Sequence, residues 1–181
     1  MKSSDLKREE NYDEYLRLSQ NEDYVDVTFD EESGGVSAVH RLHKFDKQMG
    51  AYGMRRGEYE IVVARVLRKS GHSVILESEL SSGQKKCDGL LDDTSMEIKA
   101  VEGNGTWTIS SALRAAHKQR AKCVVLFFPK QELYSENRIS EGLRLAKTNP
   151  GSGSLEFSRL LVVVCDRVVF DQNESAIGEE P

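Results

Sequence analysis

The order of apolar and polar residues divides the chain into short strands separated by helices. Helical patterns occupy residues 57–70, 111–121 and 135–147. Strand-like runs, alternating or continuously apolar, occupy 24–29, 36–40, 74–77, 87–91, 95–100, 123–128, 160–165 and 168–170. The resulting order is a hairpin followed by α, β, β, β, α, β, α, β, β. This order predicts an α/β fold with a mixed central sheet flanked by helices.

The same pattern suggests how the chain is organised. Residues 1–22 are polar and predict a frayed or partly helical leader, and the turn at Gly34-Gly35 predicts that 24–29 and 36–40 form a hairpin. Residues 41–56 are rich in Lys, Arg, His and Gly and read as a connecting loop or short helix. We therefore divide the chain into 1–56, a polar leader with a hairpin and a basic loop; 57–170, the main domain; and 171–181, an acidic tail.

Charge is distributed unevenly along the chain. The net charge of −5 combines −7 in residues 1–32, −4 in residues 171–181 and +6 in residues 33–170. A basic body between acidic ends is compatible with nucleic-acid binding. The alternative is that solvated acidic ends flank an ordinary protein surface.

Composition narrows the class of protein. No run is long and apolar enough to span a membrane, and the first residues, MKSSDLKREENYDEY, are too polar for a signal peptide. We therefore expect a cytoplasmic protein. The widely spaced Cys87, Cys123 and Cys165 form no metal-binding pair and are expected to be buried, reduced thiols.

Two acidic residues and a lysine are expected to converge on one hairpin. Side chains alternate along a strand, so Glu97 and Lys99 point the same way, and pairing across the turn 92–94 would bring Asp88 opposite Glu97. Two carboxylates, with the carbonyl of Ile98, are suitable ligands for Mg²⁺ or Mn²⁺. Such an ion activates water for attack on a phosphodiester, and Lys99 would orient that water or neutralise the phosphate.

Acidic and basic residues are common on exposed hairpins, so this motif alone is weak evidence of function. The order of the surrounding elements strengthens it. An acid-bearing helix precedes the motif, and a helix with His117, Lys118 and Gln119 follows it, before a buried strand.

Three segments resemble the PD-(D/E)XK nuclease superfamily: GEYEIVVARVLRKSGHSVILESE, KKCDGLLDDTSMEIKA and ALRAAHKQRAKCVVLFF. More narrowly, they resemble the toxin nuclease domains at the C-termini of bacterial contact-dependent inhibition proteins. The resemblance covers about residues 57–128. It implies a restriction-endonuclease-like αβββαβ core, metal-dependent phosphodiester hydrolysis and, for those toxins, tRNA as a frequent substrate.

The resemblance also implies roles for individual residues. Asp88, Glu97 and Lys99 match the first acid, second acid and lysine of the motif, and Glu60 matches the acid of the preceding helix, with Glu58 as the alternative. The polar positions of the following helix match Lys118 and Gln119, which would contact substrate phosphate. Cys87 replaces the motif's proline, and the short separation of Asp88 from Glu97 requires a tight hairpin.

Several other residues are secondary candidates. His40 and His43, followed by Asp46, form a possible metal site, although histidines near a basic loop more often contact phosphate or solvent. His117 is a possible general acid or substrate contact. Glu77 and Glu79 would either extend the carboxylate cluster or protect a strand edge. The aromatic rings of Trp107 and Tyr59 would either stack on a base or pack in the core.

The leading hypothesis is a Mg²⁺- or Mn²⁺-dependent endonuclease that acts on RNA, with tRNA favoured over DNA. If it is a toxin domain, it would be delivered into a target cell's cytoplasm and have an immunity protein as partner. The alternatives are a DNA nuclease of repair or recombination and a non-catalytic nucleic-acid-binding relative.

Overall fold

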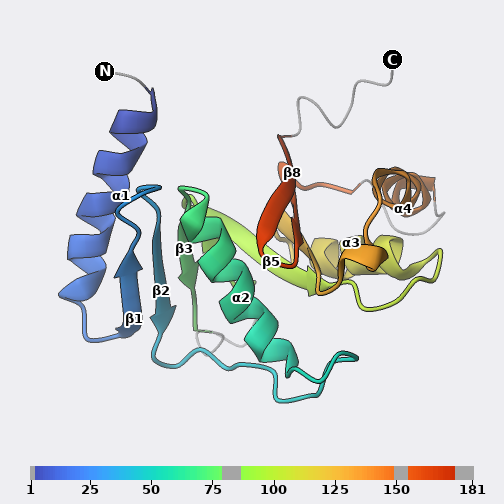
Figure 1. Cartoon of the computed structure of the whole chain (residues 1–181), viewed down its shortest axis with the longest axis horizontal. Helices are drawn as coiled ribbons and strands as arrows, with labels where there is room; N and C mark the ends of the chain where they lie inside the picture. Colours follow the sequence, from blue (N-terminus) through green and yellow to red (C-terminus); the bar gives the residue numbers. More distant parts are fainter. Residues whose placement is uncertain (1–2, 79–86, 149–154, 174–181) are drawn as a thin grey trace.

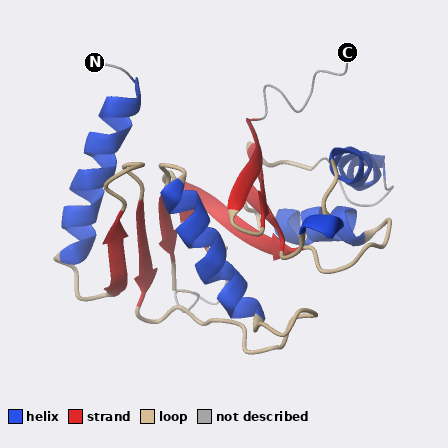
Figure 2. Cartoon of the chain, viewed as in Figure 1, coloured by secondary structure: helices blue, strands red, loops and turns tan. Residues whose placement is uncertain are grey.

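The computed structural model describes residues 3–78, 87–148 and 155–173, which form a mixed α/β fold around one sheet (Figures 1 and 2). The described strands are β1 (Tyr24–Phe29), β2 (Val36–His40), β3 (Ser73–Leu76), β4 (Gly89–Leu91), β5 (Thr94–Ala100), β6 (Cys123–Phe128), β7 (Arg159–Val164) and β8 (Arg167–Asn173). The helices are α1 (Ser3–Ser19), α2 (Arg56–Lys69), α3 (Thr108–Lys118) and α4 (Glu136–Thr148), with a 3₁₀ turn at Gln131–Leu133. The predicted α/β class is confirmed.

The strands lie side by side in their order along the chain. The β1–β2, β3–β4, β4–β5 and β7–β8 pairs are antiparallel, whereas β2–β3, β5–β6 and β6–β7 are parallel. Each parallel pair is joined by a crossover that contains α2, α3 or α4, as parallel pairing requires. The order α2-β3-β4-β5-α3-β6 agrees with the predicted αβββαβ order. The boundary that we placed after residue 56 separates β1 and β2 from β3 to β8, although all eight described strands belong to one sheet.

The helices cover both faces of the sheet. On one face, Val63 and Leu67 of α2 belong to the same buried cluster as Met96 and Val125. On the other face, Leu113 of α3 belongs to a second cluster with strand residues of β6 and β7. In this second layer α3 and α4 approach closely, since a Cβ on Gly142 would lie 2.4 Å from the Ile109 side chain. Two apolar layers therefore hold the central strands from both sides.

The N-terminal segment differs from the prediction. Residues 3–19 form a continuous helix, α1, that packs on β1 and β2 (Figure 1). Leu18 is fully buried in a cluster with Val36 and Ile75, and the buried Asn11 amide donates to the carbonyls of Gly34 and Gly71. These long-range contacts stabilise a helix whose own sequence has only a weak apolar face.

Two boundaries also differ from the prediction. Helix α3 begins at Thr108 and ends at Lys118, three residues earlier than expected, because Ile109 is needed in the core and is only 2% exposed. Strand β8 continues to Asn173, so the first three residues of the predicted acidic tail pair with β7.

Two further expectations concern membranes and cysteines. Among the described residues, no helix has the length and apolar character of a membrane span. All three cysteines are free thiols, as expected, although only Cys123 is fully buried and the other two are partly exposed.

Candidate active site

The β4–β5 hairpin has a tight two-residue turn. Asp92 and Asp93 have φ angles of +47° and +63°, the left-handed values of a type I′ turn that matches the twist of the strands. The turn pairs Leu91 with Thr94 and Gly89 with Met96. The same register, extended by one residue, places Asp88 opposite Glu97, as the sequence pattern predicted.

Gly89 allows strand β3 to lie close to the Asp88–Glu97 pair. A Cβ on Gly89 would lie 2.0 Å from the carbonyl oxygen of Ile75 in β3, so only glycine fits. This close approach lets the Glu77 backbone N–H donate to the Asp88 carbonyl at 3.0 Å. The backbone of Asp88 is therefore fixed between two neighbouring strands.

The two carboxylates and the lysine form one contact network. The backbone N–H of Asp88 donates to Glu97 Oε2 at 3.3 Å, and the N–H of Ile98 donates to Asp88 Oδ2 at 2.7 Å. Lys99 Nζ forms an ion pair with the other oxygen of Glu97. The Glu97 side chain is only 1% exposed, which is unusual for a carboxylate. The predicted convergence of Asp88, Glu97 and Lys99 is thus present in the structure.

Burial and charge repulsion perturb both carboxyl groups. Burial, followed by the Glu97 and Glu60 carboxylates, raises the pKa of Asp88 to about 7. Burial also raises the pKa of Glu97, although Lys99 counteracts part of this effect. Perturbed acids of this kind gather at functional sites, where burial and neighbouring charges are arranged to shift their pKa values.

A third carboxylate approaches the cluster from helix α2. Glu60 Oε2 lies 2.7 Å from His43 Nε2, and His43 Nδ1 lies 2.6 Å from the carbonyl oxygen of Glu77. The Glu77 carbonyl can only accept, so His43 Nδ1 donates to it, and the Glu60 carboxylate beside Nε2 favours the imidazolium form of the ring. Burial lowers the pKa of His43, but its bonds to Glu60 and Glu77 outweigh this and raise it overall.

The arrangement fits a bound divalent cation. Three acids (Glu60, Asp88 and Glu97) gather with two basic side chains (His43 and Lys99) in a mostly buried region, and a divalent cation would relieve the repulsion among the acids. Carboxylate oxygens are the ligands that Mg²⁺ and Mn²⁺ prefer. No group of three or more His, Cys, Asp or Glu side chains among the described residues is already arranged around one ion position. The fit therefore rests on the chemistry of Asp88 and Glu97, with backbone or water ligands completing the shell.

His43 is expected to act as a positioning residue for Glu60. Replacing His43 with Ala should lower any cleavage rate about tenfold, as loss of a partner that orients an active-site group commonly does. The same change in a Glu60→Gln background should have little further effect on the rate, since the oriented carboxylate is already gone. The matched control is His40→Ala, because His40 Nδ1 accepts from the nearby Leu42 N–H at 3.1 Å and its ring packs on Tyr24. Additive rate losses in the double variant would contradict the positioning role.

The raised pKa of Asp88 makes a prediction about stability without metal. The unfolded carboxyl titrates near 3.8 and the folded one at about 7, so the folded protein binds the extra proton between these values. Stability should therefore fall as pH rises from 5 to 8, by an amount on the order of 3 kcal/mol. Urea unfolding in EDTA measures this change. Asp88→Asn should make stability depend less on pH and leave the part of the dependence that comes from His43. An unchanged pH slope in the variant would contradict the burial of this carboxyl.

The structure separates the two candidate acids of helix α2. Glu58 Oε2 accepts from the Arg55 backbone N–H at 2.7 Å and caps the start of the helix. Glu60 faces His43 and influences the pKa values of both Asp88 and Glu97. Glu60 is therefore the helix acid that lies at the carboxylate cluster.

Glu77 does not join the cluster through its side chain. Its Oε1 accepts from the Tyr24 hydroxyl at 2.8 Å, while its backbone contacts Asp88 and His43. The expectation that the Glu77 carboxylate extends the cluster is therefore wrong, because this carboxylate is hydrogen-bonded to Tyr24 of β1. Glu79 lies outside the described residues.

The possible site formed by His40, His43 and Asp46 is absent. His40 turns toward the Leu42 N–H and the Tyr24 ring, whereas His43 turns toward Glu60. Asp46 Oδ1 accepts from the Gln48 backbone N–H at 2.8 Å. The sequence pattern did identify His43 as chemically relevant but gave it the wrong partner, because Glu60 lies 17 residues further along the chain.

The residues predicted to contact substrate lie at the C-terminal end of α3. Lys118 is the last helical residue, and the carbonyl oxygen of Gln119 accepts from the Cys87 thiol at 3.4 Å, one residue from Asp88. His117 Nδ1 accepts from the Glu156 backbone N–H at 3.3 Å. The Gln119 backbone therefore lies near the carboxylate cluster, and the His117 ring is hydrogen-bonded to the Glu156 backbone.

The two aromatic candidates have opposite environments. Tyr59 is 1% exposed, and its hydroxyl donates to Glu102 at 3.0 Å, so it belongs to the core and cannot stack on a base. Trp107 is 55% exposed at the start of α3.

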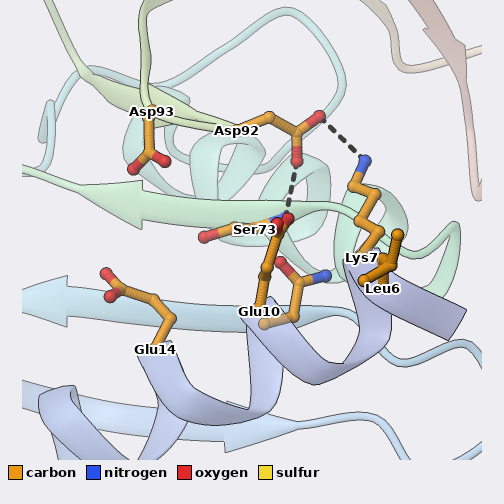
Figure 3. Close-up of a pocket in the computed structure, with 8 residues that line it drawn as sticks. Leu6, Lys7, Glu10, Glu14, Ser73, Asp92 and Asp93 are labelled. Carbon is orange, nitrogen blue, oxygen red and sulfur yellow. Dashed lines mark hydrogen bonds and ion pairs between the residues drawn. The ribbon is translucent and has the colours of Figure 1, made fainter. Parts of the chain in front are cut away.

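A separate cavity of about 500 Å³ lies between α1 and the β4–β5 turn (Figure 3). It is lined by Glu10, Glu14 and Asp93, among others, and Lys7 and the Ser73 backbone N–H both contact Asp92 at its edge. Asp92 also pairs with His72 and Arg159. Burial would raise the pKa of Asp92, but these hydrogen bonds outweigh it and hold the pKa well below its usual value. This network fixes the turn that sets the register of Asp88 and Glu97.

Comparison with known proteins supports the fold. A chain in the CdiA-CT/CdiI toxin and immunity complex from Burkholderia pseudomallei superimposes with a TM-score of 0.51. The alignment covers 76% of this chain and 98% of that chain at 12% sequence identity. The two chains share a fold. No protein-family model and no curated protein sequence matches this chain.

Proposed function

We propose that this protein is a divalent-metal-dependent nuclease of toxin type, with the Asp88–Glu97–Lys99 cluster as its active site. The observation that carries the proposal is the burial of two adjacent carboxylates beside a lysine, with the pKa of Asp88 raised to about 7. The similarity to a chain of a toxin and immunity complex supports the toxin type and an immunity protein as partner. In that role the domain would act in the cytoplasm of a target cell.

Each residue of the cluster has a distinct role in this proposal. Asp88 and Glu97, with the Ile98 carbonyl, would hold Mg²⁺ or Mn²⁺. When bound, the ion would acidify an attacking water and offset charge on the phosphoryl oxygens. Lys99 places an ammonium beside Glu97, where it can neutralise the developing charge on phosphate. Glu60, oriented by His43, adds a third negative group that helps to bind the cation.

Cleavage assays test the proposal. The purified chain is incubated with tRNA, total RNA, single-stranded DNA and duplex DNA, each with Mg²⁺, Mn²⁺ or EDTA. We expect metal-dependent cleavage, with RNA preferred to DNA. Cleavage of duplex DNA alone would instead indicate a nuclease of repair or recombination. No cleavage of any substrate and no stabilisation by metal would indicate a non-catalytic relative.

A further inference from the structure

The segment 41–56, which we call the basic loop, combines positive charge with exposed apolar side chains. It has five basic residues and one acidic residue, a balance of +4 in a chain of net charge −5. Large exposed apolar side chains are also concentrated there: Leu42 (52%), Met49 (60%), Tyr52 (37%) and Met54 (37%). Apolar side chains exposed together among cations usually mark a binding surface.

The basic loop is firmly anchored beside the carboxylate cluster. At one end, His43 contacts Glu60 through a side chain that is only 1% exposed. In the middle, the Gly57 N–H donates to the Asp46 carbonyl at 2.9 Å, and a Cβ on Gly57 would lie 2.5 Å from Phe45. Contacts of His43, Phe45 and Asp46 therefore fix the backbone of the loop, while most of its charged and apolar side chains are exposed.

Glu102 links this loop to the segment of chain that leads to Trp107, an exposed aromatic residue. Its Oε1 accepts from the Ala51 N–H at 2.7 Å, and its carbonyl accepts from the Tyr52 hydroxyl at 3.3 Å. Glu102 comes three residues after Lys99 and five before Trp107. The Trp107 backbone is fixed because its carbonyl accepts from the Ser111 N–H at 2.9 Å, while its side chain is exposed.

Lys130 adds a positive charge to the same surface. Lys130 Nζ lies 5.7 Å from the centroid of the Tyr52 ring, close enough for a cation–π contact. We call the basic loop, Trp107 and Lys130 together the rim. The rim meets the carboxylate cluster at His43, whose Nε2 lies 2.7 Å from Glu60 Oε2, so a ligand along the rim would reach the cluster.

We propose that the rim binds unpaired nucleotides, with phosphates on the Lys and Arg side chains and bases stacked on Trp107 and Tyr52. The positive charge favours a polyanion over a protein partner, and flat exposed rings suit bases, which every nucleotide carries. A base can stack on a side chain only when it is free of its own helix, so single strands and loops should bind better than duplexes. This inference rests on the proposed nuclease function, since it assigns that site a class of substrate.

Fluorescence anisotropy on the full chain in EDTA tests the inference without cleavage. The probes are a labelled single-stranded RNA of about 12 nucleotides and the same strand annealed to its complement. We expect the single strand to bind more tightly. Trp107→Ala should weaken its binding about 5-fold to 100-fold, and Trp107→Phe should retain most of it. Tyr12→Ala is the control, because Tyr12 is an exposed aromatic residue on α1 (45%).

The same single-stranded probe tests whether the basic loop binds phosphates. The double variant Lys44→Gln, Lys47→Gln should reduce the slope of log affinity against log salt by about 0.7 for each phosphate that it no longer neutralises. Lys69→Gln, at the end of α2, is the matched control and should leave the slope unchanged. An unchanged slope in the double variant would contradict the placement of phosphates on the basic loop.

Failure of this inference can be told apart from failure of the proposed function. Single-strand binding that depends on Trp107 supports the inference even if no substrate is cut. Equal affinity for duplex and single strand, or wild-type binding by Trp107→Ala, would overturn it even if RNA is cleaved. Absence of binding to either probe would also overturn it and would favour a protein as the occupant of the rim.

Discussion

Glu97→Gln should lower metal-dependent cleavage by about 10³-fold, because it removes a charge that helps to hold the ion at the reacting phosphate. The same change should leave the protein folded in EDTA, with only a small change in stability. The amide keeps one oxygen for one of the two donors to Glu97, Lys99 or the Asp88 N–H, and its NH₂ group faces the other. This loss is offset because the repulsion between Glu97 and the buried Asp88 disappears. Loss of activity with little change in stability distinguishes a functional carboxylate from a structural one.

Initial cleavage rates and urea unfolding on the same preparations provide this test. The matched control is Glu58→Gln on α2, where the amide oxygen can still accept from the Arg55 N–H and cap the helix. The control should cleave at the wild-type rate. A strongly destabilised Glu97→Gln protein, or one that cleaves normally, would mean that Glu97 has a structural role.

Asp92→Asn should produce a large loss of stability. Asp92 accepts from Lys7, His72, Arg159 and the Ser73 N–H, at distances between 2.8 and 3.2 Å. Asparagine tolerates the left-handed backbone of this turn, so the change isolates the charge and the missing acceptor oxygen. Removing one member of a buried ion-pair network costs about 3–5 kcal/mol.

Thermal unfolding measures this effect as a fall in Tm of about 10 °C for a chain of this length. Because the pKa of Asp92 is held below its usual value, its contribution should be present at neutral pH and disappear as pH falls into the strongly acidic range. The neighbour Asp93, in the same turn, supplies the matched control Asp93→Asn, which should change Tm little. Equal effects of the two substitutions would show that backbone geometry, not charge, stabilises the turn.

The parts of the site that sequence could predict are local in the chain. Strand alternation places Glu97 and Lys99 on one side, and the Asp92-Asp93 turn sets the register that brings Asp88 opposite them. Both features depend on residues close together in the sequence. The buried strand β6 was also predicted from local features, because its short apolar run ends at Pro129.

The features that sequence could not predict depend on contacts between distant segments. His43 lies 34 residues before Glu77, whose carbonyl it contacts, and Arg159 lies 67 residues after Asp92. Helix α1 has little apolar periodicity and is stabilised by Leu18 and Asn11 against the sheet. A His-x-x-His spacing looked like a metal site, yet tertiary structure directs the two rings to different partners.

The acidic charge near the N-terminus and the basic loop have separate places in the fold. Residues 20–32, which include β1 at one edge of the sheet, have six acidic residues and no basic residue (Figure 1). The basic loop instead borders the carboxylate cluster through His43 and Glu60. A polyanion would therefore be directed to the cluster and away from β1.

In the proposed function, Asp88 and Glu97 bind a divalent metal. Anomalous diffraction from crystals of the protein soaked in Mn²⁺ would locate the ion, with Glu97→Gln crystals as the comparison. We predict a strong anomalous peak within coordination distance of the Asp88 and Glu97 carboxylates, weakened or absent in the variant. Bound Mn²⁺ found only elsewhere, or no peak at any Mn²⁺ concentration that the crystals tolerate, would contradict metal binding by Asp88 and Glu97.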